Sequence, residues 1–104
     1  ELEAETSWTD AFEAVKNDKE CIRLVQSVAD QHNFKSHNIK HPFPWSEDFG
    51  LFTSHYKGAL FGLGSGKNQP QLHNNDYDFP DDIIETGVTM FWNIIDHHLK
   101  NKTH

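Results

Sequence analysis

The sequence predicts an α/β protein in which a partial, mostly parallel sheet is flanked by helices. Two observations predict this class. Two kinds of segment alternate along the chain. Short apolar or alternating segments are typical of strands, and segments whose apolar residues recur every three or four positions are typical of helices. Residues with capping or turn preferences separate them. Three strands make a poor independent core, so we expect part of the sheet to be missing from this chain.

Three segments are predicted strands. Residues 1–7 alternate between two faces, which is typical of a half-exposed strand. Residues 34–39 are short and polar and predict only a weak strand. Residues 59–63 are almost wholly apolar, which predicts a buried strand that ends at the glycine-rich run beginning with Gly64.

Two longer segments are predicted helices. Residues 18–32 carry apolar side chains at three- and four-residue spacing, with Asn17 as the cap and Glu20 completing a capping box. The last helix opens at Pro80, with acidic residues in its first turn, and runs to about Leu99.

A short helix is predicted between them. Ser46 is placed to cap it, and Glu47 and Asp48 fall in its first turn, near the positive end of the helix dipole. Phe49 continues the helical spacing, and the helix is expected to end near Tyr56.

Composition limits the possible classes of protein. The 104 residues are enough for one domain or part of one, and 12 % aromatic residues argue against disorder. A net charge of −7 with scattered Lys and Arg excludes nucleic acid as a partner. No apolar run approaches the roughly 20 residues that span a membrane. The single cysteine, Cys21, indicates a reducing, cytoplasmic setting. The start at Glu1 fits either a processed protein or a piece of a longer one.

His73 is the candidate functional residue. It lies in the loop that follows the predicted strand 59–63, where α/β proteins present side chains to ligands. Histidine in such a loop can be a metal ligand or an acid/base. From the residues alone, an ordinary surface-loop histidine remains the simpler interpretation, and no complete metal site accompanies it.

Four short motifs, in order, carry a family resemblance. They are Ser-Glu-Asp-Phe at 46–49, Gly-Leu-Gly at 62–64, Leu-His-Asn at 72–74 and Phe-Pro-Asp-Asp at 79–82. This ordered set, within residues 17–99, resembles the carboxy-terminal part of the catalytic domain in the aminoacylase and carboxypeptidase family of two-metal amidohydrolases. The resemblance implies three parts: residues 1–8 as the last strand of an inserted lid domain, 9–16 as a linker, and 17–104 as the catalytic segment.

The same resemblance implies an activity. The complete enzyme would hydrolyse amide bonds of N-acyl amino acids or short peptides with two divalent metal ions, zinc first, with manganese or cobalt as alternatives. His73 would be a metal ligand. The residues expected to line the substrate pocket are Ser46, Glu47, Asp48, Phe49 and Gly64. The family's other ligands and its catalytic glutamate have no counterpart in this sequence, so this chain alone is expected to bind no metal tightly and to be inactive.

An alternative stays open beside the enzyme hypothesis. The chain would then be a non-catalytic α/β fragment or interaction module that self-associates through an exposed sheet edge, since an unpaired edge strand favours pairing with a second chain.

Overall fold

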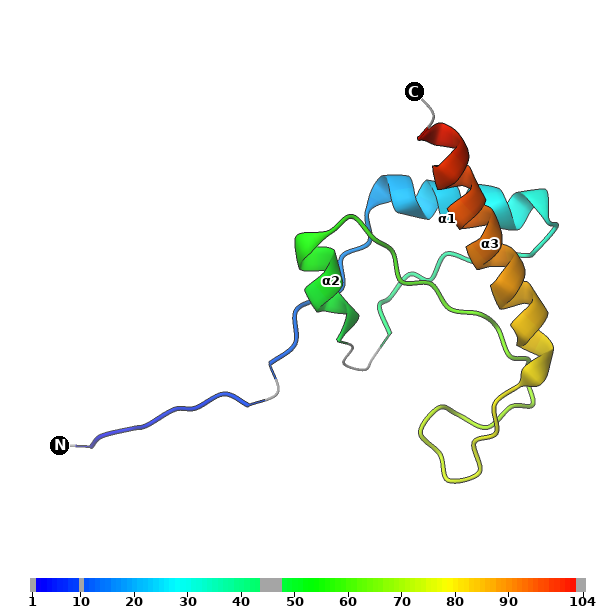
Figure 1. Ribbon diagram of the computed structural model, residues 1–104. Coiled ribbons are helices and arrows are strands. Elements are labelled where there is room, and N and C mark those ends of the chain that lie inside the picture. The colour runs from blue at the N-terminus through cyan, green and yellow to red at the C-terminus, as the bar shows by residue number, and fades with distance from the viewer. Residues whose placement is uncertain (1, 10, 44–47, 103–104) are drawn as a thin grey trace.

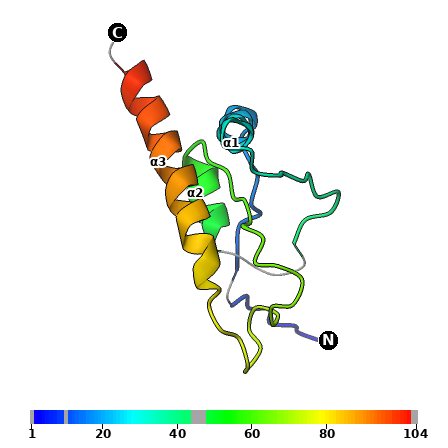
Figure 2. The same cartoon turned by 90° about the vertical axis from the view of Figure 1, so that its right-hand side faces the viewer.

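The computed structural model describes residues 2–9, 11–43 and 48–102 (Figure 1). The elements in chain order are α1 (Lys19–Gln31), α2 (Phe49–His55), the 3₁₀ turn η1 (Asp81–Ile83) and α3 (Ile84–Asn101). Helix α3 crosses α1, and α2 lies to one side of the crossing (Figure 1, Figure 2). Within these described stretches, no helix is long and apolar enough to cross a bilayer.

The predicted α/β class is wrong, because the described residues form helices and no β-strand. Residues 2–9 form an extended arm that points away from the helices, with Leu2 and Trp8 exposed (Figure 1). Residues 34–39 are irregular. Alternation and apolarity indicate only that a segment suits a pleated surface, whereas a strand also needs a neighbour that exchanges backbone hydrogen bonds with it. The expected sheet edge is therefore not observed in the described part of the chain.

Residues 59–63, the predicted buried strand, are tied down at one end by a side chain. The Asn17 Nδ2 donates to the carbonyl of Leu60 at 3.0 Å, and the Leu60 N–H donates to Asn17 Oδ1 at 2.8 Å. Next to this pair, the Asp18 N–H donates to the Gly58 carbonyl at 2.9 Å. The amide of Asn17 therefore makes the two bonds that a neighbouring strand would otherwise make with Leu60.

Helix α1 begins one residue later than the predicted cap. The carboxylate of Asp18, not the side chain of Asn17, accepts from the N–H groups of Glu20 at 2.9 Å and Cys21 at 3.1 Å. These bonds, led by the one from Cys21, hold the pKa of Asp18 below its ordinary value. The expected capping box is wrong as well, since the Glu20 carboxylate instead pairs with Lys57 at 2.8 Å.

The other end of α1 closes with a Schellman motif. Asn33 adopts a left-handed φ of 58°, its N–H donates to the Asp30 carbonyl at 3.1 Å, and the Phe34 N–H donates to the Ala29 carbonyl at 2.9 Å. This turn returns Phe34 to the core, where it packs against the buried residues. The helix predicted over 18–32 is thus confirmed to within a residue at each end.

The other two predicted helices are also present. Helix α2 ends at His55 with Tyr56 as its C-cap, as expected. Its predicted cap, Ser46, lies outside the described residues. The last helix begins after Pro80 with the tight turn η1 and continues as α3 past Leu99.

The core lies where α1 and α3 cross. Among the residues that the structure describes, the buried apolar side chains are Val28 and Ala29 of α1 and Met90 of α3. Gly87 of α3 is also buried, and a Cβ there would stand 3.3 Å from Leu63, so the missing side chain lets residues 59–63 approach the helix closely. The partly buried residues packed against this core are Leu24, Val25, Phe34, Phe61 and Ile94.

Met90→Ala is expected to lower the free energy of unfolding by about 2–5 kcal/mol, because it leaves a cavity between α1 and α3. Urea unfolding followed by far-ultraviolet circular dichroism measures the change. Leu51→Ala is the matched control, since Leu51 is 59 % exposed on α2. Equal losses for the two variants would contradict a core centred on Met90.

Asp18→Ala is expected to destabilise the chain at neutral pH and to have a shrinking effect in acid. A carboxyl whose pKa is lowered on folding contributes stability above its ordinary pKa of about 4 and loses it as the pH falls through the lowered folded value. Urea unfolding of both proteins between neutral pH and about pH 3 measures the difference. Asp76→Ala, in the exposed loop before η1, should leave the acid dependence of the parent unchanged; a gap between parent and Asp18→Ala that stays constant with pH would refute the role of this cap.

Candidate functional site

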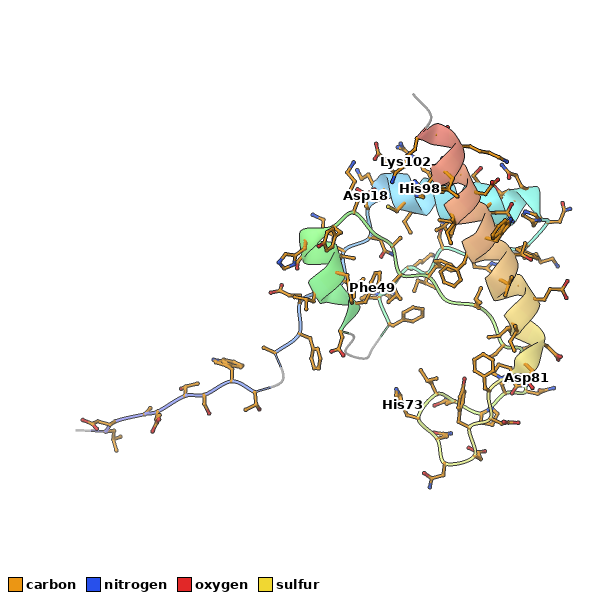
Figure 3. The ribbon with its side chains drawn as sticks, in the orientation of Figure 1. Asp18, Phe49, His73, Asp81, His98 and Lys102 are labelled. Carbon is orange, nitrogen blue, oxygen red and sulfur yellow. The ribbon has the colours of Figure 1, made fainter. Side chains whose placement is uncertain are left out.

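His73 lies on a loop that projects beyond the start of α3 (Figure 3). Two turns shape this loop: the Asn74 N–H donates to the Gln71 carbonyl at 3.1 Å, and the Tyr77 N–H donates to the Asn74 carbonyl at 3.1 Å. His73 itself is exposed and has a left-handed φ of 72°. Few non-glycine residues take this conformation, although His, Asn and Asp take it more often than others. The local turns therefore hold a histidine ring at the surface in an unusual backbone conformation.

The residues expected to line the pocket are only partly described. Ser46 and Glu47 lie outside the described residues. Asp48 is exposed where α2 begins, and no hydrogen bond of its side chain caps the helix. Phe49 is half-buried, and its ring lies 5.8 Å from that of Phe52 one turn later.

The structure does not bring His73 and Phe49 together. Figure 3 places Phe49 at the beginning of α2 and His73 on the far loop, with the chain between them. Gly64, the remaining expected pocket residue, is exposed, and a Cβ there would meet nothing within 4 Å. The described members of the predicted site therefore lie in three separate places: the start of α2, residue 64 and the His73 loop.

A separate open groove of about 1180 Å³ runs beside α1. Its walls come from the segment before α1, from α1, from residues 33–43, from residues 60–64 and from Thr86 and Met90 of α3. Gly64 is the one described site residue that lines it. His37 and His41 also line it, whereas His73 does not. The groove is thus bounded by irregular segments and by helices α1 and α3, and the loop that carries His73 takes no part in it.

The described residues do not fit a complete metal centre. No three His, Cys, Asp or Glu side chains lie close enough together to hold a metal ion anywhere in the stretches that the structure describes. A zinc site needs three or four such ligands in one place. One exposed histidine could supply a single nitrogen ligand, and no catalytic step is assigned to the residues of this chain.

Cys21, the single cysteine, lies near the hydrogen bonds and the ion pair that join the start of α1 to residues 57–60. Burial, aided by the neighbouring Asp18 carboxylate, raises its pKa, so at neutral pH the thiol is protonated. The nearby ammonium of Lys57 has a raised pKa because it pairs with Glu20. Cys21 therefore has the properties of a packing residue rather than of a nucleophile.

The sequence analysis did not predict the hydrogen bonds and the ion pair that hold residues 57–60 in place. The bonds from Asn17 to Leu60 join residues 43 positions apart, and the ion pair of Glu20 with Lys57 joins residues 37 positions apart. An asparagine next to a capping aspartate gave no signal for such a partner. These contacts orient the segment that leads toward Gly64, although they contribute no chemistry of their own.

Comparison with known proteins identifies the family. The family model described as Peptidase family M20/M25/M40 matches residues 2–97. The match spans all four motifs and begins ahead of residue 17, so it covers more of the chain than the motifs do. No curated protein and no solved structure matches significantly.

The extent of the match decides the assignment. It runs through α1, α2 and most of α3 and includes the His73 loop. The resemblance carried by the four motifs is therefore confirmed at the level of the family. The chain belongs to peptidase family M20/M25/M40.

Proposed function

We propose that this chain is the carboxy-terminal part of the catalytic domain of a two-metal amidohydrolase that cleaves N-acyl amino acids or short peptides. The observation that carries the proposal is the family match over residues 2–97, because it includes His73 together with the ordered motifs around it. Peptidases of this family are generally metal-dependent hydrolases. Zinc is the first choice of metal, with manganese or cobalt as alternatives.

His73 is the proposed metal ligand. Its ring is exposed, and the two turns around it fix the backbone in a left-handed conformation that costs free energy. Such conformations concentrate at ligand sites, where the surrounding structure maintains them. Imidazole nitrogen is a common ligand of zinc and of other divalent transition metals.

The remaining ligands are proposed to come from polypeptide outside these residues. In this arrangement, the segment 46–49 and Gly64 contribute to the wall of the substrate pocket, and residues 1–8 end a lid domain. Phe49 supports the pocket role, because a half-buried aromatic ring at the start of a helix offers an apolar surface to an acyl group or side chain.

His73→Ala tests the ligand role in the polypeptide that the complete gene encodes. We expect kcat/KM for N-acetyl amino acids to fall by about 100-fold or more, because losing one ligand weakens the metal site. Metal content measured on the same preparations should fall in parallel. His55→Ala is the matched control, since His55 is an exposed histidine on α2. A His73→Ala protein with full activity and full metal content would contradict the assignment.

Zinc titration of the isolated 104-residue chain tests whether the site is shared with other polypeptide. We expect calorimetry to show only weak binding, with a Kd of about 10 µM or higher, because one histidine cannot hold the ion. Hydrolysis of N-acetyl amino acids by the same preparation should stay at background. Nanomolar binding that disappears in His73→Ala, or metal-dependent turnover by the isolated chain, would show instead that these residues complete a site unaided.

A further inference from the structure

The side chain of Asn17 binds both backbone polar groups of a single residue in the segment 58–64. Its Oδ1 accepts from the N–H of Leu60 at 2.8 Å, and its Nδ2 donates to the Leu60 carbonyl at 3.0 Å. The neighbouring Asp18 adds a bond from its own backbone N–H to the carbonyl of Gly58 at 2.9 Å. A side-chain amide has both donors and an acceptor, so it can satisfy an N–H and a C=O together. The start of α1 is therefore joined to alternate residues of this segment.

These bonds fix the register of the segment. In an extended chain, the N–H and C=O of one residue point to the same side, and those of the next residue point to the opposite side. The Asn17 amide can therefore make both bonds to Leu60, whereas the backbone groups of Ala59 and Phe61 point away from it. A shift of the segment by one residue would exchange its two rows of side chains, as it does in a strand.

The two rows differ in size and in burial. Phe61 packs on the core, and Leu63 lies 3.3 Å from the position that a Cβ of Gly87 would take. Gly62 and Gly64, which alternate with them, are exposed. A Cβ added at Gly64 would meet nothing within 4 Å. The observed register therefore places the large side chains against the helices and the residues without side chains on the open side.

We propose that Asn17 is a positioning residue: through Leu60 it holds Gly64 at the wall of the substrate pocket and so sets the size of the group that the pocket accepts. The inference rests on the proposed function, in which Gly64 contributes to that wall. A slip of one residue would bring Leu63 to the position of Gly64. A leucine side chain there would fill space that an acyl group or an amino-acid side chain of the substrate needs. Asn17 itself touches no substrate and acts only through the backbone of Leu60.

The other side chains that contact this segment restrain its register less. Glu20 and Lys57 form an ion pair whose side chains are 72 % and 71 % exposed, and such long side chains can follow a shift of the backbone. Phe61 and Leu63 make apolar contacts, which are not directional. The two hydrogen bonds of Asn17 are directional and join a short side chain to the backbone itself. Asn17 is thus the side chain whose loss permits the slip.

Substrate selectivity tests the proposal in the polypeptide that the complete gene encodes. The substrates are two series of N-acyl amino acids, one increasing in size at the acyl group and the other at the amino-acid side chain. We expect Asn17→Ala to raise KM for the large members of at least one series about fivefold more than for the small members, because a narrower pocket excludes large groups. The value of kcat should change less than KM. Metal content per chain should equal that of the parent, since His73 lies on another loop.

Asp18→Ala is the matched control for this substitution. It removes the cap of α1 beside Asn17 but leaves the Asn17 amide in place. It should destabilise the protein and still keep the parent's ratio of KM values between large and small substrates. A purely structural role of Asn17 predicts the same result for Asn17→Ala. An Asn17→Ala protein that keeps the parent's substrate preference would therefore overturn the proposal.

Hydrogen exchange gives a readout that does not depend on activity. In the same polypeptide, Asn17→Ala should speed exchange of the Leu60 amide by about tenfold or more, because that N–H loses its acceptor. Mass spectrometry of short peptides covering residues 57–64 measures the rate. Glu20→Ala, which breaks the exposed ion pair with Lys57, should leave the rate unchanged.

The two measurements separate failure of this inference from failure of the proposed function. A parent protein that hydrolyses no N-acyl amino acid contradicts the proposed function, and the pocket role of Asn17 falls with it. Normal hydrolysis and metal content, combined with unchanged substrate preference or unchanged exchange of the Leu60 amide in Asn17→Ala, contradict this inference alone.

Discussion

The crossing of α1 and α3 is the contact on which the rest of the described structure depends. Met90 meets Val28 and Ala29 there, and these are the buried apolar side chains of the described residues. Residues 59–63 are placed by the same crossing, because Phe61 packs on this core and its ring lies 5.9 Å from that of Phe91. Because the core is so small, polar contacts such as the two hydrogen bonds between Asn17 and Leu60 are important for positioning the chain.

The helices could be predicted because their signals are local. Spacing of apolar residues and capping side chains act within a few positions of the helix that they define. The one error at a helix start has a non-local cause. Asn17 and Asp18 are both good caps, and the choice between them follows from Leu60, which engages the Asn17 amide from 43 positions away.

The strands could not be predicted for the opposite reason. Residues 59–63 are extended and partly buried, as their apolar composition indicates, yet a sheet also needs neighbouring strands. An apolar composition indicates only that a segment is buried. In this chain, residues 59–63 are partly covered by helices and not by neighbouring strands. The candidate site shows the same contrast between local signals and contacts between distant residues. Motif order identified the family and pointed to His73, but the relative placement of His73 and Phe49 depends on distant packing, on which the motifs carry no information.

The two faces of α3 differ in how closely they are packed. The inner face uses Gly87 and Met90, a missing side chain and a flexible one, to fit closely against Leu63 and α1. The outer face carries branched and aromatic residues that stay at least half exposed, although the ring of Phe91 reaches that of Phe61. A helix that only covered a core would need one apolar face, with polar residues opposite. Helix α3 has two, and the described residues leave most of the second one exposed.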